Sequence, residues 1–153
     1  MTVTYADAAL ENIRDVVDLS RQMHEESAYR AMPFDMEWLA QTVYEKVLQP
    51  DTGYGRIAYR DGVPIGMMLG ALATHNFGPA LFAYDFAWYV VPEVRGSSTA
   101  IKLLRSFEKW AKDRGALEIH LGVTTNVAPE RTGKMFKRLG YTHVGCNYTQ
   151  LLS

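Results

Sequence analysis

Residues 84–114 read YDFAWYVVPEVRGSSTAIKLLRSFEKWAKDR, and they predict a strand, a short turn and a long helix. The first part is aromatic and β-branched, as in a buried strand, and Pro92 ends it. The turn from Arg95 to Ala100 holds only small residues after the arginine, and Ser97 or Ser98 can cap the helix that follows. Because a helix N-terminus carries unpaired N–H groups and a partial positive charge, such a turn admits an anion.

This stretch also carries a family motif. Val90-x-Pro92-Glu93-x-Arg95-Gly96-x-x-x-Ala100 resembles the acetyl-CoA signature of the GCN5-related N-acetyltransferase (GNAT) family, in which R/Q-x-x-G-x-G/A follows a V-x-P strand end. Ser98 stands where the family usually has its central glycine. A serine still presents its amide there if its backbone stays helical, and its hydroxyl adds a donor for a phosphate.

A second motif lies downstream. Met135-Phe136-Lys137-Arg138-Leu139-Gly140-Tyr141 resembles the closing motif of the same family, usually L-Y-x-K-x-G-F. The N-terminal half of the chain agrees with the family in the order of its elements only. The two motifs together favour the GNAT fold.

Hydrophobic periodicity gives the remaining elements. We expect strands at 3–6, 56–59, 63–73, 81–91, 117–123, 141–145 and 148–152, and helices at 8–27, 36–47, 100–114 and 130–139. This order predicts a single α/β domain over residues 1–153, a mixed central sheet of about seven strands flanked by about four helices. The GNAT resemblance implies the same arrangement.

Composition narrows the class of protein. With 153 residues, 48% hydrophobic and 22% charged, the chain is typical of one soluble domain. A formal charge of −1 argues against a nucleic-acid partner, and the longest apolar stretches are too short or interrupted to span a membrane. The N-terminus does not read as a signal peptide, and the single Cys146 fits a cytoplasmic protein. We find no metal-ligand cluster and expect no metal.

The resemblance implies acetyl-CoA as co-substrate. Backbone groups of Trp88 and Val90 would pair with the pantetheine arm, and the amides of the turn would hold the pyrophosphate. A backbone N–H near Val90 would stabilise the developing oxyanion. The implied cofactor-binding residues are Trp88, Val90, Arg95, Gly96, Ser97, Ser98, Thr99, Ala100 and Asn126.

Catalysis in this family is a direct attack of an amine, which must lose a proton to a base. We favour Asp85, because an ionisable group in an apolar strand is costly to bury unless it is paired or functional. The alternative is a structural hydrogen bond from Asp85 to a loop. Other candidate bases are Glu25, Glu26, His24 and His75.

The family's proton-donating tyrosine corresponds to Phe136, which has no proton to give. Tyr148, Tyr141 or Cys146 could substitute, and we name Tyr148 as the candidate; each of the three also has a structural reading. A thiolate with a pKa near ~8.5 can also leave without full protonation.

The acceptor side is expected around the connection between the first two helices, which walls the substrate cleft in this fold. Candidate substrate-binding residues are His24, Glu26, Tyr29, Phe34 and His75, although aromatic residues at helical spacing also fit a core. Glu25 or Glu26 could hold a cationic amine.

Three functions stay open on the sequence. The first is an N-acetyltransferase that acts on a primary amine of a small molecule or protein. The second is a catalytically impaired CoA-binding or interaction module, which Phe136 and Ser98 favour. The third is a toxin-like acetyltransferase acting on aminoacyl-tRNA, which the charge disfavours. The acceptor and the oligomeric state stay open, and a homodimer is compatible with the sequence.

Overall fold

The computed structural model describes residues 2–123, 125 and 127–152. Its sheet has five strands in the order β1 (Val3–Asp7), β2 (Gly53–Arg60), β3 (Val63–Thr74), β4 (Leu81–Val90) and β5 (Glu118–His120). The first four strands pair antiparallel, and β4 pairs with β5 in parallel. The sheet is therefore mixed, as the sequence predicts.

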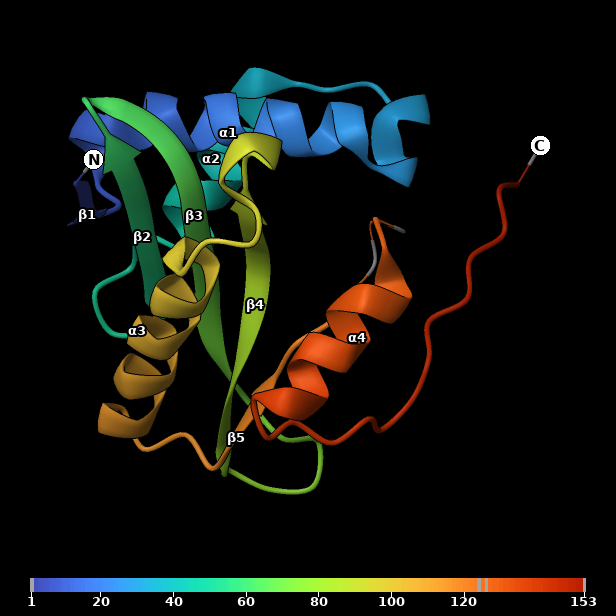
Figure 1. The fold of residues 1–153 in the computed structure, drawn as a ribbon. Coiled ribbons are helices and arrows are strands. Elements are labelled where there is room, and N and C mark those ends of the chain that lie inside the picture. Colours follow the sequence, from blue (N-terminus) through green and yellow to red (C-terminus); the bar gives the residue numbers. More distant parts are fainter. Residues whose placement is uncertain (1, 124, 126, 153) are drawn as a thin grey trace.

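The described part of the chain has four α-helices: α1 (Ile13–Glu26), α2 (Met36–Lys46), α3 (Thr99–Asp113) and α4 (Pro129–Arg138). Short 3₁₀ turns, η1 (Leu10–Asn12), η2 (Ala28–Ala31) and η3 (Pro92–Val94), link them to their neighbours. In Figure 1, α3 lies in front of the sheet and α1 and α2 lie behind it. The prediction of an α/β fold with about four helices is confirmed.

The core lies between the sheet and these helices. Strand β3 is an almost continuous buried run, and the apolar stripe of α3 packs on the sheet through Leu103, Leu104, Phe107 and Ala111. A Cβ at Gly70 would lie 2.5 Å from the Phe107 ring, so glycine lets α3 approach β3 closely. Among the described helices, none is long and apolar enough to cross a membrane.

The prediction of about seven strands is wrong. The expected strands at 141–145 and 148–152 do not form, and the chain runs from α4 away from the body as an extended segment (Figure 1). Val144 and Leu151 are 93% and 81% exposed. The β-prone residues of this segment have no neighbouring strand to pair with, and β propensity depends on such packing. The strand expected at 117–123 is also shorter, since β5 ends at His120.

Strand β4 separates from its neighbour halfway along. It pairs with β5 only through Phe82, Ala83 and Tyr84. Just beyond, the register against β3 shifts, because Asp85 faces Gly70 while Ala87 faces Leu69, which leaves Phe86 as an extra residue. Such a bulge bends and twists a strand. From Asp85 onward, one edge of β4 therefore lacks a partner strand.

Candidate active site

The turn that follows β4 is open to solvent and shaped by one glycine. Gly96 has φ +88°, which favours glycine, and a Cβ there would meet nothing within 4 Å. Ser98 is in the helical region, with φ −75° and ψ −5°, as its predicted role requires. The N–H groups of Gly96, Ser98 and Ala100 have no acceptor among the residues that the structure describes.

A serine side chain closes the start of α3. Ser97 Oγ donates to the Val94 carbonyl at 2.6 Å and accepts from the Thr99 N–H at 3.3 Å. Of the two capping serines that the sequence offers, Ser97 therefore makes the contact, and α3 begins at Thr99. The free N–H groups and the helix dipole make this turn attractive to an anion.

The open edge of β4 presents backbone groups beside this turn. The Val91 N–H donates to the Ile65 carbonyl on β3 at 2.9 Å. Because backbone direction alternates along a strand, the N–H and C=O groups of Trp88 and Val90 point the opposite way, to the open edge. Val90 C=O indeed accepts a bond from Arg95 Nε at 3.2 Å, so the Arg95 side chain lies along this edge.

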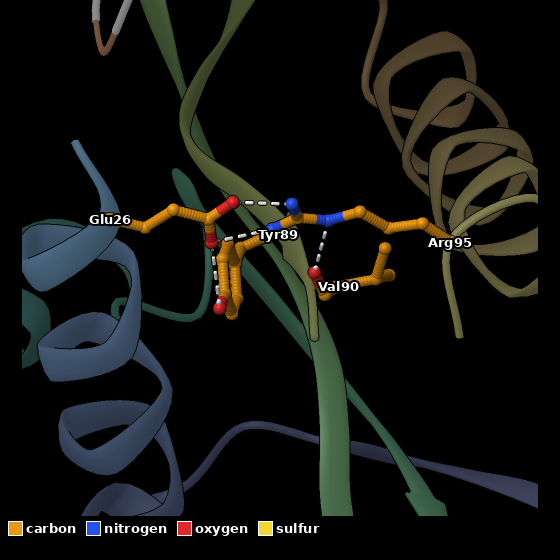
Figure 2. A network of polar contacts seen from close by, with 4 residues as sticks. All are labelled: Glu26, Tyr89, Val90 and Arg95. Atoms are coloured by element: carbon orange, nitrogen blue, oxygen red, sulfur yellow. Dashed lines mark hydrogen bonds and ion pairs between the residues drawn. The ribbon is translucent and has the colours of Figure 1, made fainter. Parts of the chain in front are cut away.

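Arg95 extends from the turn to the end of α1. In Figure 2, its guanidinium makes a bidentate contact with the Glu26 carboxylate. Nη2 lies 2.7 Å from Oε2, and Nη1 contacts Oε1. The Tyr89 hydroxyl donates to the same Oε2 at 3.3 Å, and the guanidinium lies over the Tyr89 ring, 5.5 Å from its centroid. Three elements that are distant in sequence therefore meet at the end of β4.

These contacts fix the charge state of the cluster. The hydrogen bond from Arg95 lowers the pKa of Glu26 despite partial burial. Burial raises the pKa of Tyr89 to about 12, and the Glu26 charge adds to the effect. Glu26 is thus a carboxylate, and Arg95 and Tyr89 occupy both of its oxygens. This arrangement favours a structural role for Glu26 over the predicted contacts with an amine or its proton.

The junction of α1 and η2 touches both sides of the opening between β4 and β5. Glu26 reaches the turn after β4, while the Ala28 N–H donates to the Thr125 carbonyl in the loop after β5, at 2.9 Å. Between them, Ser27 is buried and its Oγ accepts from the Tyr29 N–H at 3.1 Å. The junction therefore contacts both the turn after β4 and the loop after β5.

Asp85 lies where β4 and β5 separate, and it is half-buried. Burial raises the pKa of Asp85 to about 6, although hydrogen bonds from the Gly122 N–H and its own N–H lower it. The Gly122 N–H thus supports the alternative of a hydrogen bond to a loop, while the loss of water keeps the pKa of Asp85 above the ordinary value of an aspartate. At about 3.3 Å per residue, five positions put Asp85 roughly 16 Å from Val90 along the strand.

Two predicted histidines have partners elsewhere. His24 Nε2 lies 2.8 Å from the Met32 carbonyl, and its ring packs on Phe34, so both residues hold the connection between α1 and α2. His75 Nε2 lies 3.1 Å from Glu118 Oε1 at the far end of β4. Phe82, on which His75 packs, lies eight positions or about 26 Å from Val90, so His75 does not join the site.

The remaining candidates are scattered. Tyr148 is 93% exposed in the extended C-terminal segment and does not approach β4 in this structure. Glu25 and Tyr29 are exposed at the junction of α1 and η2. Asn126 lies outside the described residues.

Phe136 has a clear packing role. Its ring stacks on Trp88 with centroids 5.8 Å apart, and Trp88 Nε1 donates to the Ala100 carbonyl at 3.1 Å. Phe136 thus connects α4 to β4 and α3. The Tyr141 hydroxyl contacts Glu108 at 3.2 Å, and burial, with the Glu108 charge, raises the pKa of Tyr141. Tyr141 therefore keeps its proton across the neutral range.

The pairing of Glu26 with Arg95 was not predicted. Both residues were candidates, but they are 69 positions apart, and no local pattern signals a contact at that separation. The bulge at Phe86, which opens the edge of β4, also has no sequence signal here, because the strand lacks an internal glycine.

A mixed sheet whose fourth strand pairs with β5 over three residues only, and then leads into a turn of small residues, defines a GNAT-like α/β fold. The sequence model of the acetyltransferase (GNAT) family matches residues 13–141, so the chain belongs to that family. No curated protein sequence matches the chain significantly. The family resemblance stated from the two motifs is confirmed.

Solved structures agree on the fold. A putative acetyl transferase from Pyrococcus furiosus has a TM-score of 0.76 at 22% identity, over 99% of this chain and 100% of that one. Ribosomal-protein-alanine N-acetyltransferase from Brucella melitensis biovar Abortus 2308 has a TM-score of 0.72 at 16% identity, over 99% and 100%. AAC(6')-Iy in complex with the bisubstrate analog CoA-S-monomethyl-acetylneamine has a TM-score of 0.76 at 17% identity, over 100% and 99%.

Proposed function

We propose that the protein is an N-acetyltransferase that moves an acetyl group from acetyl-CoA to a primary amine of a small molecule or protein, by direct attack in a ternary complex. One observation carries the proposal. The open edge of β4 leads directly into an exposed turn of small residues with unpaired N–H groups at the start of α3.

The residues present fit acetyl-CoA. The N–H groups of Gly96, Ser98 and Ala100 would hold the diphosphate, and the open backbone of Trp88 and Val90 would align the pantetheine arm. When bound, acetyl-CoA supplies the acetyl group as an activated thioester. A backbone N–H near Val90 would then face the acyl oxygen, where a fixed dipole stabilises developing charge.

Asp85 is the proposed base. Its pKa of about 6 leaves it mostly ionised at pH 7 and above, which suits acceptance of a proton from an amine. Since Asp85 lies about 16 Å from Val90 along the strand, the proton would pass through water. No described side chain replaces the family's tyrosine, so the thiolate would leave without a dedicated acid.

The acceptor would bind at the junction of α1 and η2. Tyr29 is exposed at this junction, and Trp38 is exposed on α2. Glu25 adds an exposed carboxylate. These groups offer an apolar surface and a negative charge to a cationic amine. Two proteins of similar fold also support an amine: one acetylates a ribosomal-protein alanine by its name, and the other binds an acetylneamine analog.

A second function, a CoA-binding module without chemistry, is favoured by the position of Phe136. Its ring packs on Trp88 and brings no proton to the site. Such a module would bind acetyl-CoA and release no thiol with any acceptor.

A thiol-release assay separates the two. Purified protein with acetyl-CoA would be tested against aminoglycosides, alkyl amines, peptides with free N-termini and aminoacyl-tRNA. The variant Asp85→Asn, which lacks the proposed base, would be tested beside the wild type. Saturable release with an amine, reduced at least a hundredfold in the variant, is expected. Binding without release across the panel would contradict the transferase, and release with aminoacyl-tRNA alone would replace the proposed acceptor.

A further inference from the structure

The connection between α1 and α2, together with the start of α2, exposes large apolar side chains. Tyr29, Met32, Met36 and Trp38 all lie within residues 29–38, and each is at least 43% exposed. We call residues 29–38 the apolar segment. A gathering of exposed apolar side chains, above all of aromatic residues and methionines, is typical of a surface that binds a partner.

The apolar segment starts beside the opening between β4 and β5. Its first turn, η2, begins at Ala28, whose N–H donates to the Thr125 carbonyl in the loop after β5, at 2.9 Å. Further along, the Met32 carbonyl lies 2.8 Å from His24 Nε2 on α1, and the Phe34 ring packs on the same histidine. The exposed side chains therefore lie on a connection that runs from the loop after β5 to α2.

The charges at the start of this segment do not fit a polycation. Arg95 and Tyr89 occupy both oxygens of Glu26. Glu25 is exposed, and so is the positively charged Arg30 in η2. An aminoglycoside, which brings several ammonium groups, would therefore meet one accessible carboxylate and a like charge at this junction. An acceptor with a single amine fits these charges better.

The carboxylates farther along the segment are accounted for by α2. Asp35 accepts from the Trp38 N–H at 2.9 Å and so caps the helix, and Glu37 lies in its first turn. Negative charge at both positions stabilises a helix N-terminus. Neither residue therefore needs a cationic ligand to explain its place.

The hollow on this surface is small. It lies beside Trp38 on α2, has a volume of about 110 Å³, and is also lined by Gln41, Thr42 and Glu45. Sites for drug-sized ligands are larger, roughly 300–1,000 Å³. Gln41 and Glu45 bond to each other at 2.7 Å, and Thr42 Oγ1 donates to the Trp38 carbonyl at 2.9 Å. With these polar groups paired, the hollow suits one apolar side chain against the indole, and not a set of sugar rings.

The proposed base favours one kind of amine. A proton moves uphill by about four pKa units from a lysine ammonium to a carboxylate with the pKa of Asp85, about 6. From a peptide α-ammonium, whose pKa is about 7.7–8.0, the same transfer is uphill by only about two units. The α-amine of a peptide is therefore the better match to Asp85.

We propose that the acceptor is the N-terminal α-amine of a polypeptide whose first residues are apolar, and that the apolar segment binds those residues with Trp38 as the anchor. Side chains on one side of an extended peptide recur about every 7 Å, so such a peptide can contact the segment at several points. The inference rests on the proposed acetyltransferase function. It narrows the acceptor from any primary amine to one class.

The test measures thiol release with five acceptors. These are a hexapeptide that begins Ala-Leu-Val-Phe, a matched hexapeptide that begins Ala-Ser-Asn-Ser, an N-terminally blocked peptide with one lysine, neamine, and an aminoacyl-tRNA. The variants are Trp38→Ala and Tyr29→Ala. Phe77→Ala is the matched control, since it also removes an exposed aromatic side chain but lies in the loop between β3 and β4. The indole N–H signal of Trp38 in ¹⁵N-labelled protein with CoA reports peptide binding without turnover.

We expect kcat/KM for the apolar peptide to exceed that for every other acceptor at least tenfold. Trp38→Ala should raise KM for this peptide at least tenfold and change kcat less than twofold. The KM for acetyl-CoA and the melting temperature should stay the same, because the indole is 75% exposed and contributes little to the core. Tyr29→Ala should act in the same direction, and Phe77→Ala should match the wild type. The Trp38 indole signal should shift with the apolar peptide and not with the polar one.

Four results would overturn the proposal. These are equal kcat/KM for the apolar and polar peptides, faster turnover of neamine or of the lysine peptide, an unchanged KM in Trp38→Ala, or release with aminoacyl-tRNA alone. Turnover of another amine, with no shift of the Trp38 signal by peptide, would remove the peptide assignment and leave the acetyltransferase. If the wild type releases no thiol with any acceptor, the proposed function and this assignment both fail.

Discussion

At the scale of single residues, the charged form of Asp85 is unfavourable for the stability of the fold. It is half-buried where β4 and β5 separate, and the favourable backbone N–H groups of Gly122 and of Asp85 itself do not offset the loss of water, so its pKa rises to about 6. A raised pKa means that the folded protein holds the proton more tightly than the unfolded chain, whose aspartate titrates near 3.8. Charging Asp85 therefore costs stability as the pH rises from about 4 to 6, and the full cost is present above pH 6.

Asp85→Asn should remove that cost and the proposed base together. At pH 8 we expect a more stable variant, by about 3 kcal/mol at most, and a fall in kcat of at least a hundredfold. The gain in melting temperature should shrink below pH 6 and disappear below about pH 4, where the carboxyl is protonated in both the folded and the unfolded protein. Thermal melts at a series of pH values check the stability. Profiles of kcat against pH check the role as base, because kcat should fall on the acid side near pH 6 in the wild type only.

The exposed Asp51 gives a control, because Asp51→Asn should alter neither quantity. A variant Asp85→Asn that is less stable at pH 8 and fully active would show that the carboxylate serves only its hydrogen bond to Gly122.

The sequence predicts residues of this site unevenly. The motif sets the condition that Ser98 keeps a helical backbone, and the structure has Ser98 in that region. The cost of burying Asp85 was also read from its apolar neighbours. The partners of Glu26, His24 and His75 were not predicted, because a charged residue in a sequence does not indicate which distant group its side chain will contact.

At the scale of elements, the turn after β4 depends on one backbone conformation. Gly96 has φ +88°, and the positive φ, rather than lack of space, is what excludes other residues there. Holding an alanine in that conformation costs about 1–2 kcal/mol. The turn would otherwise relax and move the N–H groups that face the proposed diphosphate.

Gly96→Ala should therefore weaken CoA binding several-fold and lower the melting temperature by a few degrees. Gly78→Ala is the matched control, since its Cβ also meets nothing within 4 Å and its φ is not positive. Calorimetry and thermal melts measure both effects. Equal CoA affinity in the two variants would mean that the turn does not hold the cofactor.

Elements are also where prediction from sequence worked best. The strand, turn and helix over residues 84–114 were expected, and β4, η3 and α3 are observed there. Strong periodicity in α3 and the proline after β4 are local signals, so they can be read from sequence. The bulge at Phe86 was missed, because it depends on how two strands align rather than on residue type.

At the scale of the whole molecule, the extended segment after α4 distinguishes the structure from the expected sheet of seven strands. Tyr141 still packs against Phe136 and Glu108, whereas residues 142–152 belong to no helix or strand. A strand is stable only when its backbone bonds to another, and those partners cannot be counted from sequence.

Backbone amides of residues 142–152 should therefore exchange with deuterium within seconds at neutral pH, while those of β4 should be protected. Hydrogen exchange read by NMR or mass spectrometry checks this. Slow exchange at alternate residues of the segment would indicate that the two missing strands do form, in solution or against a second copy of the chain.

The account as a whole depends on an acetyl-CoA site at the turn before α3, and calorimetric titration with acetyl-CoA tests it most directly. The wild type should bind saturably at one site. Ser98→Glu, which places a carboxylate among the free N–H groups, should raise the Kd at least tenfold without lowering the melting temperature. Absence of binding, or equal affinity in the two proteins, would contradict the assignment of the cofactor site.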